Sequence, residues 1–221
     1  MMLQNPPGVP GRSAAGVESS WQETLRRPVF HLVWAMVVSG AMAGLMVSGL
    51  VQPFVTDQLA GDGLDPVKAL AVGTAAVGWL AVFNALGRVL WGVASDRVGR
   101  KLAFVVMFGL QAVTMFSLGH LQGALLLCVG AALVGFNFGG NFALFPAVTS
   151  DLFGAKNFGA NYGWMFTAFG IAGVAGILAG NAAKVMTGSY VFAFTLAGVL
   201  CVISAGLTLI LPKPAKPVPT G

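Results

Sequence analysis

Charged side chains are scarce in this chain. Only 9% of its 221 residues are Asp, Glu, Lys or Arg, whereas 57% are hydrophobic and the mean hydropathy is +0.83. An average soluble domain carries about 25% charged residues, so this shortage excludes a soluble globular protein and indicates a membrane protein. About 20 apolar residues cross a hydrocarbon core as a helix. Six runs are long enough: 29–52, 68–95, 102–119, 121–149, 161–184 and 188–211.

These runs are too long and continuous for the strands of a membrane barrel. We therefore predict an all-α membrane protein with six transmembrane helices. Residues 1–28 form a predicted cytoplasmic segment. Its first 20 residues are rich in Pro, Gly and Ser, and Ser20-Trp-Gln-Glu23 has the pattern of a capping box. Residues 29–211 form the predicted bundle, and residues 212–221 form a Pro-rich cytoplasmic tail that cannot continue the last helix.

Cysteine is also rare, and both cysteines, Cys128 and Cys201, lie in apolar runs. No Cys-x-x-Cys or Cys/His spacing is present, so we expect packing residues, no metal and no cofactor. Six-helix intramembrane proteases need a Gly-x-Ser loop and a histidine deep in a helix. No such loop occurs in or between the apolar runs, and His31 and His120 lie near their ends. The Asn-Pro-Ala repeats of water channels are missing too, so we expect neither an enzyme nor a channel.

The net charge of +5 reports topology rather than a nucleic-acid partner. Six spans permit both termini to be cytoplasmic. In that case Lys68 and Lys184, at the ends of their spans, are the only cations on the outer face, which also carries Asp57, Asp62 and Asp65. This asymmetry is the positive-inside bias, which predicts a protein of the cell (inner) membrane with both termini in the cytoplasm. The predicted inner cations are Arg12, Arg26, Arg27, Arg97, Arg100, Lys101, Lys156, Lys213 and Lys216.

Arg88 is the only ionisable residue deep inside a predicted span. A cation at that depth costs at least about 2.5–3.5 kcal/mol unless something offsets the cost. The nearest acid in the sequence, Asp96, lies about 12 Å away along a helix, at the membrane face. A guanidinium presents a planar fork that matches a carboxylate. We predict that Arg88 binds an organic anion and that Asn84, one turn away, orients it. The alternative is a structural arginine bound to backbone carbonyls or to a partner helix.

The fourth and fifth predicted spans hold further candidates. Asn137 and Asn141 are four residues apart and share a helix face. They either line a solute path, on a helix that neighbouring glycines and Pro146 allow to bend, or form an interhelical hydrogen-bond pair. Aromatic residues crowd the same region, and we expect most of them to pack and a minority to wall the cavity. These are Phe136, Phe138, Phe142, Tyr162 and Trp164, of which Tyr162 and Trp164 are the candidates for the wall.

The strongest motif lies in the connection after the second span. It consists of Gly92, Asp96, Arg97, Gly99, Arg100 and Lys101. The motif resembles the signature between the second and third helices of each half of major facilitator superfamily transporters. That resemblance implies a clamp on the inner face, in which Asp96 faces the amino terminus of the fifth span near Asn161 and either Arg97 or Arg100 pairs with Asp151. The alternative is plain topogenic charge, which would require neither Asp96 nor the glycines.

Further segments resemble the carboxyl-terminal half of oxalate:formate antiporter-type carriers. Residues 3–8 resemble their central loop, residues 84–88 their eighth helix, and residues 140–146, 151–154 and 161–163 their tenth and eleventh helices. The resemblance implies that the chain is one half of a twelve-helix alternating-access carrier, that Arg88 is a substrate ligand, and that an amino-terminal six-helix half is its partner. That half is expected to be a separate chain or to be missing by truncation.

Two departures from the resembled carriers bear on the substrate. The oxalate carriers place a lysine midway along their eleventh helix, whereas the matching region around Phe169 has no cation. Proton-coupled monocarboxylate carriers, which the chain also resembles, have an Asp where Asn84 stands. A single fixed positive charge suits a monoanion better than a dianion. Asparagine cannot take up or release a proton, so this position offers no site for proton coupling. We therefore expect exchange of a small carboxylate across the bilayer, the alternative being a six-helix assembly or regulatory protein that does not transport.

Overall fold

The computed structural model describes residues 18–212, which fold into helices joined by short connections. The helices are α1 (Trp21–Arg26), α2 (Pro28–Gly61), α3 (Pro66–Val98), α4 (Arg100–Leu118), α5 (Ala124–Phe153), α6 (Phe158–Thr187) and α7 (Val191–Ile210). Helices α2 to α7 are long and apolar enough to cross a membrane. The predicted all-α class with six spans is therefore confirmed. The Pro- and Gly-rich opening through residue 17 and the tail from residue 213 lie outside the described residues.

The largest departure from the predicted boundaries is at the end of α2. The apolar run ends at residue 52, but the helix continues through Pro53 to Gly61. The additional turns bury Phe54 and Leu59 in the core. They also carry Asp57 to Lys184 at the end of α6, with 2.9 Å between Oδ2 and Nζ. The acidic stretch that starts at Asp57 is thus partly helical, because these tertiary contacts outweigh the loss of one backbone donor at the proline.

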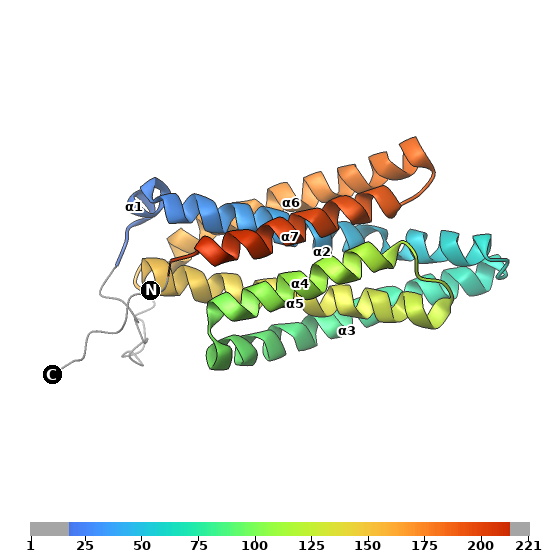
Figure 1. Cartoon of the computed structure of the whole chain (residues 1–221), viewed down its shortest axis with the longest axis horizontal. Helices are drawn as coiled ribbons and strands as arrows, with labels where there is room; N and C mark the ends of the chain where they lie inside the picture. Colours follow the sequence, from blue (N-terminus) through green and yellow to red (C-terminus); the bar gives the residue numbers. More distant parts are fainter. Residues whose placement is uncertain (1–17, 213–221) are drawn as a thin grey trace, which may run out of the picture.

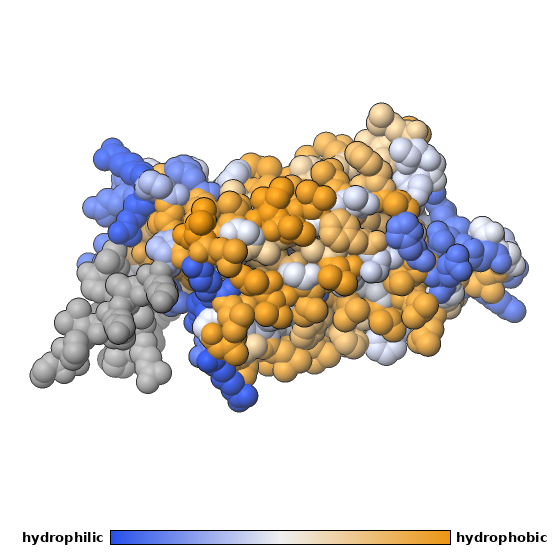
Figure 2. Space-filling view, viewed as in Figure 1, coloured by the Kyte–Doolittle hydropathy of each residue, from blue (hydrophilic) through white to orange (hydrophobic). Residues whose placement is uncertain are grey.

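The six long helices form a bundle in which successive helices run in opposite directions (Figure 1). Helix α3 packs chiefly on α5, α4 on α7, and α2 on α6, while α2 also contacts α3, α5 and α7. In Figure 1, α1, the α3–α4 connection and the carboxyl end of α7 lie at one end of the bundle, and the α2–α3 and α6–α7 connections lie at the other. We call these the α1 end and the α2–α3 end. Figure 2 shows an apolar band between two polar ends, as expected of a membrane bundle.

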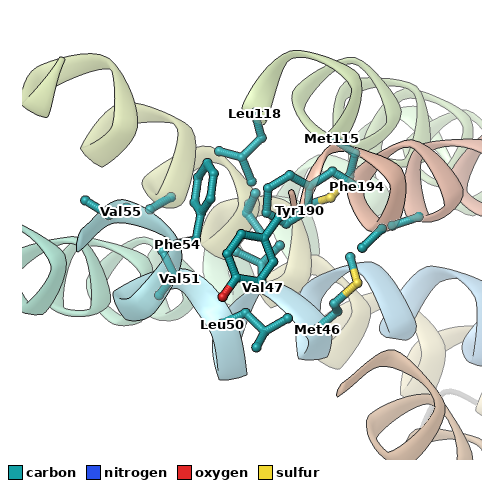
Figure 3. Close-up of a cluster of buried hydrophobic side chains, with 14 of the residues drawn as sticks. Met46, Val47, Leu50, Val51, Phe54, Val55, Met115, Leu118, Tyr190 and Phe194 are labelled. Carbon is teal, nitrogen blue, oxygen red and sulfur yellow. The ribbon is translucent and has the colours of Figure 1, made fainter. Parts of the chain in front are cut away.

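Two clusters of apolar side chains fill the bundle. The cluster in Figure 3 joins α2, α4 and α7, where Phe54 meets Phe194 edge to face with 4.9 Å between ring centres. The second cluster is built around Phe104, Phe108 and Phe145. Cys201 is buried in the first cluster and Cys128 packs against it, and both are free thiols. Each cysteine is therefore in the kind of apolar setting expected of a packing residue.

The α1 helix starts with the capping box that the sequence predicts. The backbone N–H of Glu23 donates to Ser20 Oγ, and the backbone N–H of Ser20 donates to the Glu23 carboxylate at 2.8 Å. The backbone N–H and the hydroxyl of Ser20 both donate to the Glu23 carboxylate, and these two bonds lower the pKa of Glu23 because they stabilise its charged form.

Helices α3 and α5 approach so closely that only glycine fits between them. A Cβ atom on Gly135 would lie 2.1 Å from the carbonyl oxygen of Leu80, and one on Gly139 would lie 2.1 Å from that of Asn84. Small residues permit such contact between helices in lipid. Helix α5 is continuous from Ala124 to Phe153, so these glycines serve interhelical packing within one uninterrupted helix.

Gly139→Ala is expected to lower the stability of the bundle, because the new methyl group forces α5 away from the α3 backbone. Overpacking of this kind costs about 1–3 kcal/mol. Gly109→Ala on α4 is the matched control, because no atom lies within 4 Å of a Cβ there. The midpoint of thermal unfolding in detergent measures the difference. Equal midpoints for the two variants would show that the α3–α5 contact is not tight.

Candidate functional site

Arg88 lies on the exposed side of α3 and is held from two directions. Its Nε donates to Asn84 Oδ1 at 3.2 Å, one helical turn away. Its guanidinium carbon lies 4.3 Å from the centre of the Phe142 ring on α5, within the range of a cation–π contact. The predicted neighbour Asn84 is therefore in contact with Arg88, and Phe142 is an additional member of this group.

The position of Asn84 is fixed by the α3–α5 contact. Its Nδ2 donates to the carbonyl oxygen of Gly135 at 3.4 Å, and its own backbone carbonyl packs on Gly139. The amide thus links the α5 backbone to the Arg88 side chain. The sequence shows the four-residue spacing of Asn84 and Arg88, but it does not show which aromatic ring of α5 lies beside them.

The two terminal nitrogens of Arg88 have no hydrogen bond or ion pair within residues 18–212. Ion pairs in this part of the chain join Arg100 to Asp96 and Asp151, and Lys184 to Asp57. No backbone carbonyl of the described residues accepts a hydrogen bond from Arg88, whose one hydrogen bond goes to the side-chain oxygen of Asn84. The planar fork is therefore open to an anion from outside the described chain.

A run of aromatic rings continues from Phe142 into α6. Phe142 stacks on Phe169 with 5.2 Å between ring centres, and Phe169 stacks on Phe166 at 4.9 Å. Tyr162, one of the candidates for the cavity wall, lies next in this run, 5.8 Å from Phe166. Phe169 itself is buried, so the group of rings beside Arg88 is aromatic on its α6 side and continues into the bundle.

Three other candidates make no hydrogen bond, ion pair or ring contact with Arg88, whose partners are Asn84 and Phe142. Asn137 and Asn141 are each only 2% exposed, and the oxygen of Asn141 lies 3.5 Å from the place of a Cβ atom on Gly40 of α2. Both asparagines point into the bundle, as packing residues do, and the Oδ1 atoms of both lack a partner among the described side chains and backbone. Trp164 stacks on Trp21 of α1 at 6.0 Å, so it lies at the α1 end of the bundle. These placements do not support a cavity wall made of Asn137, Asn141 and Trp164.

The motif residue Arg100 joins three helices at the α1 end. Its Nη1 lies 2.6 Å from Asp96 Oδ1 on α3, and its Nε lies 3.0 Å from Asp151 Oδ2 on α5. The same Nη1 donates to Ser95 Oγ at 2.5 Å. Gly99 makes this possible, because its φ of +88° lets α4 start directly at Arg100. Of Arg97 and Arg100, it is therefore Arg100 that pairs with Asp151. Ser95 is an additional partner of Arg100 that the motif did not predict.

The remaining motif residues, Gly92, Arg97 and Lys101, are not part of this network of ion pairs around Arg100. Gly92 lies on α3 with Ala143 of α5 3.8 Å from its Cβ position. Arg97 and Lys101 make no ion pair with any residue between 18 and 212.

The described structure shows no contact between Asp96 and the amino terminus of the fifth span, and Asp96 pairs with Arg100 instead. Asn161 of α6 and Asn157, which directly precedes α6, each donate to the carbonyl oxygen of Ser19 at 3.1 Å. The backbone N–H of Ser19 in turn donates to Phe153 at the end of α5. The reason is the packing order: α3 packs on α2, α4 and α5, whereas α6 packs on α2, α5 and α7. Ser19 has no sequence signal that would have identified it.

Comparison with known proteins supports this architecture. The chain is 30% identical to the oxalate:formate antiporter of Oxalobacter formigenes over 204 residues, which cover 89% of this chain and 46% of that protein. It is 42% identical to apicoplast pyruvate carrier 2 of Toxoplasma gondii over 93 residues, 41% of this chain and 14% of that carrier. It is 28% identical to monocarboxylate transporter 14 of Mus musculus over 135 residues, 60% of this chain and 26% of that transporter.

These matches span less than half of each relative's own length. Residues 35–221, most of the chain, match the family profile of the Major Facilitator Superfamily. With six membrane-spanning helices and this match, the chain is a multi-pass membrane protein that belongs to the Major Facilitator Superfamily of transporters.

Proposed function

We propose that this chain transports a small carboxylate by exchange, as one six-helix half of an alternating-access carrier. The observation that carries the proposal is the open guanidinium fork of Arg88, which Asn84 and Phe142 hold in place. A fork of this geometry binds a carboxylate through two parallel hydrogen bonds. The names of the antiporter, the pyruvate carrier and the monocarboxylate transporter agree with a carboxylate substrate.

A second six-helix half is part of the proposal for an energetic reason. Helices α3 and α6 are the least buried spans, and Arg88 lies on the exposed side of α3. A guanidinium that faces hydrocarbon is costly, so this surface needs a polar cover. Facilitator carriers bind solute near the bilayer midplane between their two halves. A non-transporting assembly protein would need another partner for Arg88, and residues 18–212 supply none.

The same residues favour a monoanion and an exchange cycle. Arg88 is the single cation deep inside the spans, and the neighbouring part of α6 has the buried Phe169 and the exposed Phe166 instead of a cation. A single fixed charge balances one carboxylate. Asn84 cannot take up a proton, so the site offers no titrating group beside the arginine. Return of the carrier is then expected to require a second anion.

Arg88→Ala is expected to reduce exchange of a labelled monocarboxylate by about 10- to 100-fold, the range given by losing a charge-assisted hydrogen-bonded contact. Arg88→Lys keeps the charge but loses the planar fork, so its exchange should also fall well below that of the wild type. The measurement uses proteoliposomes that contain both halves of the carrier.

Arg26→Ala is the control for Arg88→Ala, because Arg26 is an exposed cation on α1, away from the site. Undiminished exchange in Arg88→Ala would refute the role of Arg88 as a substrate ligand and indicate a structural role.

The orientation is also part of the proposal: both termini and the α1 end are cytoplasmic, and Asp62 faces outward. The positive-inside bias is its support. In a background with Cys128 and Cys201 replaced by alanine, an impermeant thiol reagent added to intact cells should label Asp62→Cys and spare Val98→Cys. The reverse labelling pattern would overturn this topology.

We further propose that Arg100 stabilises the closed state of the cytoplasmic face by joining α3, α4 and α5. Arg100→Gln leaves both carboxylates without a cation, whereas Asp96→Asn leaves the contact with Asp151. Thiol labelling of Ala85→Cys from the cytoplasmic side measures opening of this face. A shift of about 1 kcal/mol would raise the labelling rate about fivefold in Arg100→Gln, with a smaller rise in Asp96→Asn.

The matched control for Arg100→Gln is Arg97→Gln, because Arg97 carries the same charge without an ion pair in the described chain. The clamp is refuted if Arg100→Gln and Arg97→Gln label at the same rate.

A further inference from the structure

Three amide side chains are buried in the middle of the bundle. They are Gln111 of α4 and Asn137 and Asn141 of α5, and each is only 2% or 3% exposed. The Oδ1 atoms of both asparagines, and both polar atoms of the Gln111 amide, have no hydrogen-bond partner among residues 18–212. A buried polar atom without a partner is costly, so each of these atoms needs one. The proposed anion site around Arg88 uses none of them.

The packing of α4 on α5 brings Gln111 to the height of Asn137. The two helices run in opposite directions (Figure 1). Met107 Sδ lies 2.5 Å from the place of a Cβ atom on Gly140, so these two residues are opposite each other. Gln111 lies one turn after Met107 on the buried face of α4, and Asn137 lies about one turn before Gly140 on α5. In antiparallel helices these two steps lead the same way, so Gln111 and Asn137 are at one level.

Asn141 completes the group on the side of α2. Its Oδ1 lies 3.5 Å from the place of a Cβ atom on Gly40 of α2. The ring of Phe108, one turn before Gln111 on α4, packs at the same glycine. Asn137 and Asn141 are one turn apart, which puts their Cβ atoms about 5–6 Å from each other. The three amides therefore come together where α2, α4 and α5 meet.

The unpaired atoms of this group fit a water molecule. The two asparagine oxygens are both acceptors, so neither can satisfy the other. A water molecule has two hydrogens to donate, and a buried one makes about three hydrogen bonds. A cation fits less well, because the three amides include no carboxylate and a full charge is costly at this depth.

We propose that Gln111, Asn137 and Asn141 bind a buried water molecule that joins α4 to α5. The water donates to the two asparagine oxygens and accepts from Gln111 Nε2. Trp91 of α3 borders the group, because its Cδ1 lies 2.7 Å from the place of a Cβ atom on Gly140. Its Nε1 is likewise unpaired in the described chain, so a second water molecule can connect it to Gln111 Oε1. The site is independent of the proposed transport function.

Radiolytic footprinting of the purified full chain in lipid nanodiscs tests the proposal. An X-ray pulse converts water to hydroxyl radicals, which oxidise the side chains that the water touches. Met107 borders the three amides and is 1% exposed, whereas Met165 is equally buried near the start of α6. Met107 should therefore be oxidised faster than Met165, although neither methionine is open to bulk solvent.

Two variants remove the ligands of the water. Asn137→Leu combined with Asn141→Leu replaces both acceptors by apolar side chains of similar volume, and oxidation of Met107 should fall to the rate of Met165. Gln111→Leu removes the donor and should also slow it, which keeps the test open if the double variant does not fold. Thermal unfolding midpoints show which variants are folded.

Thr114→Val is the matched control for these variants. Thr114 is a buried polar residue of α4, but its hydroxyl already donates to the carbonyl oxygen of Leu110. Its replacement should leave the oxidation of Met107 unchanged.

Equal oxidation of Met107 and Met165 in the wild type would overturn the proposal and indicate that the amides bond directly to one another. Unchanged oxidation of Met107 in the folded Leu variants would overturn it as well, because the water would then lie elsewhere. A thermal midpoint that is higher in sodium chloride than in choline chloride for the wild type, but not for Gln111→Leu, would assign the site to a sodium ion instead.

Discussion

The close contact between α3 and α5 determines where the proposed functional side chains lie. Gly135 and Gly139 let the α5 backbone rest on the carbonyl groups of α3. This approach places Asn84 within reach of the Gly135 carbonyl and Phe142 against the Arg88 guanidinium. At the α1 end, the same pair of helices presents Asp96 and Asp151 to one arginine. A change in the spacing of α3 and α5 would therefore disturb the surroundings of Arg88 and the ion pairs of Arg100 together.

Arg88 makes the chain energetically incomplete on one face. Its guanidinium has one hydrogen bond and one ring contact among the described residues, which do not neutralise its charge. The cation–π contact contributes about 0.5–1 kcal/mol at an exposed site, less than the cost of a bare cation in hydrocarbon. The difference must come from an anion or from a polar surface that covers α3. A carrier with two halves and a carboxylate substrate supplies both, and this requirement motivates the proposed function more directly than the names of the relatives.

The features that the sequence predicted are those that depend on local spacing or on long apolar runs. The six spans follow from hydropathy, and the capping box from a three-residue spacing. Arg88 and Asn84 are one turn apart on a single helix, so their contact follows from helical geometry. The features it missed depend on which helices are neighbours. Phe142 reaches Arg88 only because α5 lies on α3, and Asn141 points toward α2 for the same kind of reason. Helical periodicity gives a face but not the helix that covers it.

The two ends of the bundle are tied in different ways, and this difference limits where movement can occur. At the α1 end Arg100 joins α3, α4 and α5, and Ser19 joins the end of α5 to the start of α6. At the α2–α3 end Lys184 joins α6 to α2 through Asp57. Each long helix is thus held by at least one polar tie, since the hydroxyl groups of Ser39 on α2 and Ser204 on α7 share a hydrogen bond inside the bundle. Helix α7 also packs on α4 and α2. Sliding of one helix within the bundle would break these ties and the glycine contacts. The six helices are therefore expected to move as one body. Access to Arg88 would then change at the exposed face of α3, because no polar tie within the described chain covers that face.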